Sequence, residues 1–281
     1  MAIAIAFGLH SALMAPLLEA RGIGYVVPAA RGRAATEVLA GVDLVLEPGE
    51  TLGVVGESGG GKTTLARILL GLVAPTRGDV AFDGRVLARG DVAGWRELRS
   101  RVQHVAQDPG SALDPATPVG LAIEEGYVVR GSRVGRRRRA ELARHLLCEL
   151  ALDERLAERL PAELSGGEQR RVLVARALAA LGYGLAPLGR SIALVADEPT
   201  AGLDFVVRAR LLRALDTQRA VAGLACVIVT HDIDVVARVA DRIAVMRAGR
   251  IVECGPADQV LWHPRDPYTQ ELVSAKASGA S

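Results

Sequence analysis

Residues 50–72 read ETLGVVGESGGGKTTLARILLGL and join three segments of different character. The first segment is apolar and ends in glycine, as a buried strand does, and the last repeats apolar residues at helical spacing. Between them, Gly56 to Thr63 fit the pattern G-x-x-x-x-G-K-[ST]. A strand, a glycine-rich turn and a helix in this order predict a loop whose backbone N–H groups surround a phosphate at the positive end of the helix.

The residues of this phosphate loop have different expected tasks. Lys62 would reach the β- and γ-phosphates of a nucleotide, and Thr63 offers a hydroxyl to Mg²⁺, which prefers hard oxygen ligands. The sequence therefore predicts a nucleotide-binding segment made of Gly56, Glu57, Ser58, Gly59, Gly60, Gly61, Lys62, Thr63 and Thr64.

Two adjacent carboxylates end a second apolar segment, IALVADE, at residues 192–198. Parallel strands of an open α/β sheet bring their C-terminal ends to the ligand crevice, which places both acids beside the phosphate loop. We expect Asp197 to hold Mg²⁺ through water and Glu198 to orient and polarise the attacking water as a general base. Without a phosphate loop, a simple strand end would be the commoner interpretation.

Two more polar residues end predicted strands, His231 after CVIVT and Gln107 after VQHVA. A neutral imidazole at the crevice could bond the γ-phosphate and the water, and a glutamine can offer both a carbonyl and an amide to metal and water. A lone histidine at a strand end is more often structural, and the glutamine alone proves nothing. Both assignments, His231 as catalytic and Gln107 as catalytic and metal-binding, therefore depend on the neighbouring motifs.

Composition limits the class of protein. Half of the 281 residues are hydrophobic and only 3% are aromatic, which favours buried strands of Leu, Val, Ile and Ala in a layered α/β protein. Lys and Arg number 34 against 32 Asp and Glu, too balanced to indicate a nucleic-acid or membrane surface. The arginine run 136–139 lacks interleaved aromatic residues and begins an amphipathic helix, so a solvated face is the better interpretation. Cys148, Cys226 and Cys254 have no CxxC spacing and are expected to be reduced, buried thiols.

Strand and helix patterns alternate along most of the chain, which predicts right-handed crossovers and a mostly parallel sheet. Short strands are expected at 20–27 and 42–46, and a helix at about 205–222. Residues 118–160 are helical in pattern and form the centre of a helical subdomain expected at about 110–165. The predicted fold class is α/β: a P-loop NTPase (RecA-like) core with a mostly parallel sheet, an antiparallel β subdomain and an inserted helical subdomain.

A second run of bare backbone amides follows at the start of a predicted helix, in ELSGGEQRR at residues 163–171. One nucleotide needs one phosphate loop, so this second run requires an explanation. Together, the motifs resemble those of the ATPase subunit of an ATP-binding cassette (ABC) transporter, over about Leu18 to Ala275. GESGGGKT and ALVADE resemble the two nucleotide motifs of that family, LSGGE its signature, and residues 201–204 the loop after the second motif.

The resemblance implies ATP and Mg²⁺ as cofactors and a head-to-tail dimer of ATPase subunits. In such a dimer the amides of Ser165, Gly166 and Gly167 close over the γ-phosphate of an ATP held by the other subunit, which explains the second run. The resemblance also assigns Asp204 to the nucleotide site and Gln107 and His231 to the glutamine and switch-histidine positions. It places Tyr25 where an aromatic ring stacks on adenine; a buried strand tyrosine is an equally good interpretation.

VGESGGGKTTLARILLGL, QDPGSALDP and the tail HPRDPYTQEL resemble the peptide/nickel importers of the family. That subgroup implies transmembrane permease subunits, a second identical or different ATPase subunit, and indirect action with a periplasmic or extracellular solute-binding protein, at the cytoplasmic face of the membrane. The solute would be a peptide, nickel or a metal chelate, and nucleic acid is not expected as a partner. The predicted domains are a flexible or mis-started segment 1–17, an ABC ATPase domain 18–255 and an importer-type tail 256–281.

Other functions are consistent with parts of the sequence. An ATPase of a soluble enzyme assembly, such as the phosphonate carbon–phosphorus lyase system, shares the tail and the second nucleotide motif, and export rather than import stays open. A DNA-repair or chromosome-maintenance cassette would need a long coiled-coil or zinc insertion, which is not found. Three departures from the family pattern are Ala106 for phenylalanine, Glu168 for glutamine, and a long loop at 182–191; none is expected to remove catalysis.

Overall fold

The computed structural model describes residues 15–29, 34–131, 133–186 and 189–278. The expected flexible or mis-started segment 1–17 lies outside them except for residues 15–17, and the last three residues of the expected tail also lie outside. Leu17, at the end of the first segment, is fully buried, and its N–H donates to the Leu46 carbonyl at 2.9 Å. Within the described residues, we find no helix that combines the length and the apolar character needed to span a membrane.

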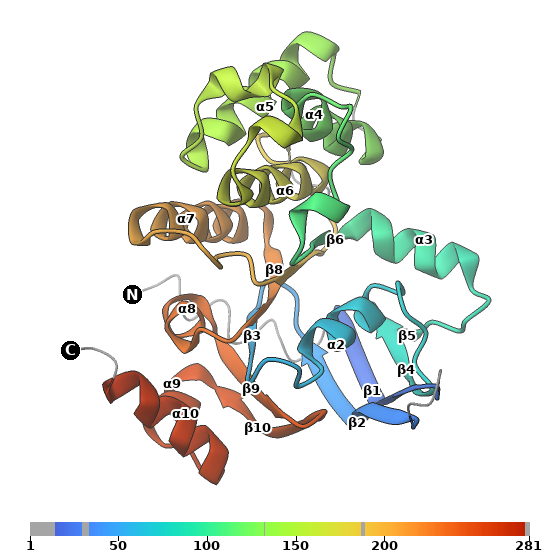
Figure 1. Ribbon diagram of the computed structural model, residues 1–281. Helices are drawn as coiled ribbons and strands as arrows, with labels where there is room; N and C mark the ends of the chain where they lie inside the picture. The colour runs from blue at the N-terminus through green and yellow to red at the C-terminus, as the bar shows by residue number, and fades with distance from the viewer. Residues whose placement is uncertain (1–14, 30–33, 132, 187–188, 279–281) are drawn as a thin grey trace.

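A six-stranded sheet forms the centre of the molecule, in the order β10-β9-β3-β8-β7-β6 (Figure 1). Its four parallel pairings join neighbouring strands from β9 to β6, and only the edge pair β10 and β9 is antiparallel. The mostly parallel sheet of the prediction is therefore confirmed. Its strands are β3 Thr51–Val55, β6 Val102–Val105, β7 Ile192–Asp197, β8 Leu224–Thr230, β9 Arg242–Arg247 and β10 Arg250–Pro256.

A second, antiparallel sheet packs on one face of the first and confirms the predicted β subdomain. Its order is β2-β1-β4-β5, with β1 Leu18–Val27, β2 Thr36–Leu46, β4 Arg77–Phe82 and β5 Arg85–Val86. β2 begins earlier than the expected residue 42, with Leu39 and Ala40 both buried; burial alternates only from Val42 through Leu44 to Leu46, as on a half-buried strand. Successive residues of β7 point into two different hydrophobic cores, Leu194 on one face of the sheet and Val195 on the other. The central sheet is therefore covered on both sides.

Helices cover the central sheet and continue into a separate helical part, drawn at the top of Figure 1. That part holds α4 Val119–Val129, α5 Arg136–Glu149 and α6 Gly166–Leu181, with 3₁₀ turns η1 Pro109–Ser111, η2 Glu154–Glu158 and η3 Pro161–Glu163. It confirms the predicted helical insertion. The remaining helices are α2 Lys62–Leu69, α3 Val92–Arg101, α7 Phe205–Ala222, α8 Ile233–Val239, α9 Ala257–Trp262 and α10 Pro267–Ser278.

Two features differ from the sequence expectation. Helix α3 was not expected, because it buries only Gly94, Leu98 and Arg101 and so has little apolar periodicity; the carboxylate of Asp91 caps its start by accepting from the Gly94 N–H at 2.9 Å. The expectation of three buried thiols was wrong for Cys148 and Cys254, which are exposed, while Cys226 is buried. Both exposed thiols lie at edges, one on the outer face of α5 and one on the edge strand β10.

Helix α4 crosses α6 so closely that Gly126 has no room for a side chain. A Cβ on Gly126 would lie 2.6 Å from the Arg176 carbonyl oxygen and 2.8 Å from the Ala180 nitrogen, both backbone atoms of α6. We expect Gly126→Ala to lower the free energy of unfolding by about 1–3 kcal/mol, because the two helices must move apart. Urea denaturation checks this against Gly90→Ala, whose Cβ meets open space; equal midpoints for the two variants would contradict the close crossing.

Candidate active site

The loop between β3 and α2 passes against the end of β9. Gly56 has φ 150°, and a Cβ there would collide with the Met246 carbonyl oxygen. Gly61, which precedes α2, has φ 96°, and a Cβ there would lie 2.8 Å from the Val38 carbonyl oxygen. Both positions therefore require glycine for space and for backbone conformation. The predicted phosphate loop is built as a tight turn at the N-terminus of α2, the arrangement that binds phosphate.

Lys62 is folded back onto its own loop. Its ammonium donates to the carbonyl oxygens of Gly56 at 2.7 Å and Glu57 at 2.8 Å, and the residue is buried. Burial lowers the pKa of Lys62, while the carboxylates of Glu198 and Asp197 act to raise it. The lysine charge thus lies at the centre of the loop, near enough to both predicted acids to interact with them.

Asp197, at the end of β7, is 2% exposed, and its Oδ1 has no hydrogen-bond partner among the described residues. Burial raises its pKa, and a hydrogen bond from the Thr63 hydroxyl opposes that rise. A buried carboxylate oxygen without a partner is costly unless a cation or water completes it. No group of three or more His, Cys, Asp or Glu within the described ranges could hold a metal alone. Mg²⁺ usually takes one or two protein ligands together with phosphates and waters, so Asp197 and Thr63 fit it.

Glu198 is held in one orientation by the end of β8. Its Oε2 accepts from the Thr230 hydroxyl at 3.0 Å, and its Oε1 accepts from the His231 N–H at 2.9 Å and lies 2.7 Å from His231 Nδ1. The backbone of Glu198 has φ 51°, a left-handed conformation that costs free energy in a residue other than glycine. Strain of this kind is often found at functional sites. The structure thus brings together Glu198 and His231, and Thr230 joins them although no sequence signal singled it out.

Two arginines of α6 hold loops of the site. Arg170 donates to the Gln107 carbonyl at 3.1 Å and also to the Ala201 carbonyl, so it joins the segment after β6 to the segment after β7. Arg176 donates to the Ala112 carbonyl at 2.8 Å, farther along the first segment. Neither arginine has a role predicted from the sequence. The available signal was that Arg176 interrupts an otherwise apolar helix face.

The second run of amides begins α6 and is exposed. Ser165 caps the helix: its hydroxyl accepts from the Glu168 N–H at 3.3 Å, and its own N–H donates to the Glu168 carboxylate at 2.8 Å. The Ser165 hydroxyl also donates to the Glu168 carboxylate at 2.7 Å, and this bond, followed by the one from the Ser165 N–H, lowers the pKa of Glu168. Gly166 has no neighbouring atom within 4 Å of a built Cβ. Open space in front of the helix start leaves room for a ligand or a partner.

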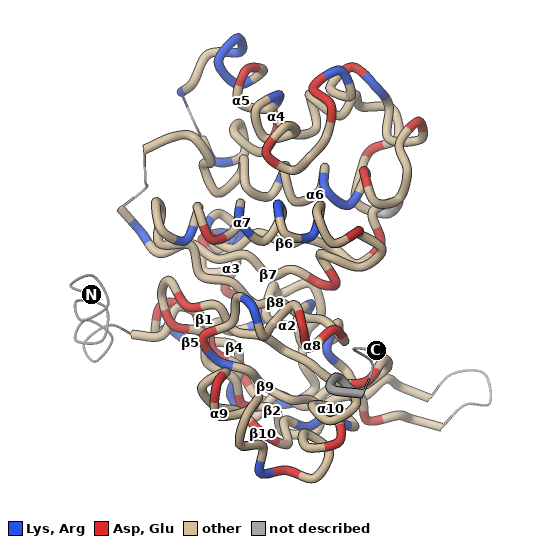
Figure 2. The backbone as a smooth tube through the Cα atoms, turned by 90° about the vertical axis from the view of Figure 1, so that its left-hand side faces the viewer, with Lys and Arg blue, Asp and Glu red and all other residues tan. Residues whose placement is uncertain are grey.

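The two runs of amides lie in different halves of the chain. Helix α6 packs on α4, β6 and β7, whereas α2 packs on β1, β2, β7 and β8. Figures 1 and 2 both draw α6 in the upper half and α2 in the lower half. One chain therefore presents its phosphate loop and its LSGGE segment as two separate surfaces.

Tyr25 and Asp204 have structural contacts of their own. Tyr25 lies on β1 opposite Leu39 and is half-buried against the core of the antiparallel sheet. Asp204 caps α7, where its carboxylate accepts from the Val207 N–H at 2.9 Å. The structure does not bring either side chain into hydrogen-bond contact with the other predicted site residues.

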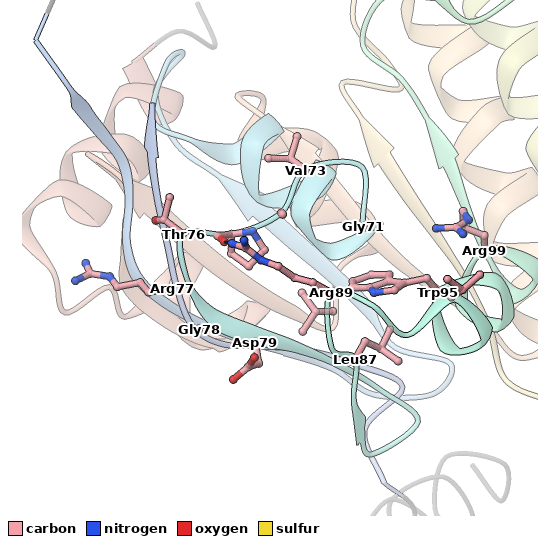
Figure 3. A pocket seen from close by; sticks show the side chains of 14 residues that line it. Gly71, Val73, Thr76, Arg77, Gly78, Asp79, Leu87, Arg89, Trp95 and Arg99 are labelled. Carbon is pink, nitrogen blue, oxygen red and sulfur yellow. Dashed lines mark hydrogen bonds between the residues drawn. The ribbon is translucent and has the colours of Figure 1, made fainter. Parts of the chain in front are cut away.

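A hollow of about 650 Å³ lies away from these residues, between the segment after α2, strand β4 and helix α3 (Figure 3). The Trp95 ring packs where a Cβ on Gly71 would stand, and Arg89 extends across the hollow to donate to the Pro75 carbonyl. None of the predicted catalytic or nucleotide-binding residues lines it. Val92, one of the lining residues, has an exposed apolar side chain.

A family model described as ABC transporter matches residues 39–201. The dipeptide transport ATP-binding protein DppF of Escherichia coli (strain K12) is 37% identical over 270 residues, which cover 95% of this chain and 78% of DppF. The oligopeptide transport ATP-binding protein OppF of Salmonella typhimurium (strain LT2) is 38% identical over 235 residues, 84% of this chain and 68% of OppF.

Solved structures give the same result. A dimeric post-hydrolysis state of the ATP-binding cassette MJ0796, bound to ADP and Pi, is similar with a TM-score of 0.74 at 27% identity, covering 86% of this chain and 99% of that one. A second dimeric structure of MJ0796, a bacterial ABC transporter cassette, has a TM-score of 0.75 at 27% identity and the same coverage. The chain therefore belongs to the ABC transporter family, and it is one of that family's ATPases.

Proposed function

We propose that the chain is the ATP-hydrolysing subunit of a peptide importer and acts on separate membrane subunits from the cytoplasmic face. The observation that carries the ATPase chemistry is Glu198, fixed by Thr230 and His231 next to a phosphate loop. The peptide class is supported by the names of DppF and OppF, whereas nickel, a metal chelate, export and a soluble enzyme assembly have no such support.

In the proposed mechanism, backbone amides of the phosphate loop and the Lys62 ammonium bind the phosphates of ATP, while the Glu57 N–H is held by another part of the chain. Asp197 and the Thr63 hydroxyl would hold Mg²⁺, which would offset the negative charge of the phosphates. Glu198 orients the attacking water and draws its proton toward the carboxylate. His231 fixes the Glu198 carboxylate and can also reach toward the γ-phosphate, since its side chain is 60% exposed.

The dimer assignment follows from the separation of the two amide surfaces. A second ATPase subunit, identical or different, would place its own phosphate loop against Ser165, Gly166 and Gly167 of this chain, where the positive end of α6 meets the γ-phosphate. Gln107 would contact the metal and the water, and Asp204 the interface between the subunits. The Tyr25 ring would stack on the adenine.

Permease subunits would contact this chain at the hollow beside α3 and at the loop after Gln107. Val92 lines the hollow and is 65% exposed, which would give an apolar contact to a partner. Helix α3 runs directly into β6 and then into Gln107. Movement of the permease would therefore reach the metal and water site by a short path. A solute-binding protein would act through the permease and not on this chain.

Glu198→Gln keeps the size of the side chain and removes the base. We expect the rate of ATP hydrolysis to fall by about 100- to 10,000-fold, with nucleotide binding retained, since a general base contributes this much. Steady-state ATPase rates and MgATP titration measure the two effects. Glu37→Gln, the same change at an exposed carboxylate paired with Arg77, should keep the wild-type rate. Wild-type hydrolysis by Glu198→Gln would remove Glu198 from its role.

Ser165→Arg places a bulky side chain at the exposed start of α6. We expect MgATP affinity of the monomer to be unchanged, while ATP-dependent dimerisation and hydrolysis are lost, because the partner's phosphates cannot approach the amides. Light scattering in the Glu198→Gln background measures dimerisation. Ser100→Arg, on the exposed face of α3, is the control. A Ser165→Arg protein that dimerises and hydrolyses normally would contradict the shared site.

Val92→Asp tests the permease contact. We expect basal ATPase activity of the isolated subunit to be unchanged, while uptake of a labelled dipeptide by cells carrying the variant falls about tenfold, as for loss of an interface anchor. Val221→Asp makes the same change at a residue that is 63% exposed at the far end of α7. If both variants transport at the wild-type rate, the hollow is not the permease contact.

A further inference from the structure

The C-terminal tail touches the phosphate loop directly. The Tyr268 hydroxyl, at the start of α10, accepts a hydrogen bond from the Glu57 N–H at 2.9 Å. The carbonyl of Glu57 in turn accepts from the Lys62 ammonium at 2.8 Å and from the Gly60 N–H at 3.2 Å. The second residue of the loop is thus fixed at its amide by the tail and at its carbonyl by the loop itself.

The Tyr268 ring rests on the strand that supports the same loop. The guanidinium of Arg247 lies over the ring, 4.6 Å from its centroid, a favourable cation–π contact. Arg247 ends β9, which pairs in parallel with β3 through Val245 and Val55. The next residue after β3 is Gly56, whose missing Cβ lets the loop pass against β9. Tyr268, the end of β9 and the loop therefore form one continuous contact.

The start of α10 is fixed from behind. The Asp266 carboxylate accepts from the N–H groups of Tyr268 at 2.8 Å and Thr269 at 3.3 Å. Glu253, on β10, accepts from the N–H groups of Arg265 at 3.0 Å and Asp266 at 3.0 Å. Tyr268 also packs against the main hydrophobic core, together with Leu272 and Val273 of α10. The hydroxyl therefore reaches Glu57 from a rigid base, which a freely moving tail could not provide.

We propose that Tyr268 is a positioning residue for nucleotide binding: its hydroxyl holds the Glu57 amide, orients the first turn of the phosphate loop and so lets the tail set the affinity for ATP. This inference rests on the proposed function of the loop. Backbone N–H groups bind phosphate well when they are oriented before the ligand arrives, because less ordering remains to be done. Coupling between two sites is reciprocal, so bound nucleotide must also stabilise the tail.

Tyr268→Phe tests the hydroxyl, because it keeps the ring on Arg247 and removes the acceptor. We expect the Kd for MgADP, measured by isothermal titration calorimetry on the full chain, to rise about fivefold, which is the value of one hydrogen bond of about 1 kcal/mol. The KM for ATP should rise by the same factor, and kcat at saturating ATP should stay at the wild-type value. A Kd equal to that of the wild type would overturn the proposal.

Tyr127→Phe is the matched control. Its hydroxyl donates to the Tyr183 carbonyl at 3.1 Å inside the helical subdomain, so the same atom is removed far from the loop. This variant should lose stability and keep its affinity for MgADP. If it loses as much affinity as Tyr268→Phe, the effect is a general loosening of the protein and the proposal is wrong.

Hydrogen exchange measures the protection of the Glu57 N–H by the Tyr268 hydroxyl directly. In Tyr268→Phe, a peptide that contains Glu57 should exchange faster than in the wild type, with other loops unchanged. MgADP should slow exchange in α10 of the wild type, and slow it less in Tyr268→Phe. Unchanged exchange at both places would contradict the coupling.

Lys62→Ala separates this proposal from the proposed function. If Lys62→Ala binds MgADP normally, the nucleotide site itself is misassigned. If Lys62→Ala loses binding while Tyr268→Phe binds as the wild type, only the role of the tail is wrong.

Discussion

The parallel register of β3, β8 and β7 is the constraint on which the site depends. Val55 pairs with Thr230, and Asp197 pairs with Val229, so the three strands end at the same edge of the sheet. The phosphate loop, His231 and the two acids leave the sheet from these ends. A slip of one residue would turn each strand's buried side chains to the opposite face, which two filled cores forbid. Packing in the two hydrophobic cores thus sets the distances between the side chains at the ends of these strands.

Burial at this edge gives the charged groups their character. Lys62 and Asp197 are both buried. Burial lowers the pKa of Lys62 and raises the pKa of Asp197, and in both cases it favours the neutral form. The carboxylates of Glu198 and Asp197 oppose the lowering of the Lys62 pKa. The hydrogen bond from the Thr63 hydroxyl is the largest effect that opposes the rise of the Asp197 pKa. Glu198 differs from Asp197 in its hydrogen bonds, because Thr230 and His231 donate to both of its carboxylate oxygens. Two neighbouring acids therefore have different environments: Asp197 has one oxygen without a partner among the described residues, and Glu198 has both oxygens hydrogen-bonded.

The sequence was most informative where a single residue type is required. The phosphate loop needs glycine at Gly56 and Gly61 and a lysine after them, so the loop could be predicted. The parallel sheet and the helical insertion could be predicted from the order of strand and helix patterns along the chain. Helix α3 escaped prediction because it rests on the sheet with few buried side chains. The contacts of Arg170 and Tyr268 could not be predicted either, because each joins residues distant in the chain and ends on a backbone atom, which carries no residue identity.

The bonds from Arg170 have a mechanical consequence. Ser165 and Arg170 belong to the same helix, and the carbonyls that Arg170 joins belong to the loops after β6 and β7. Rotation of that helix as a rigid body must displace its exposed tip and both loops together. In the proposed dimer, a shift of α6 at the face that meets the second subunit would therefore also shift the loops after β6 and β7 of the same subunit.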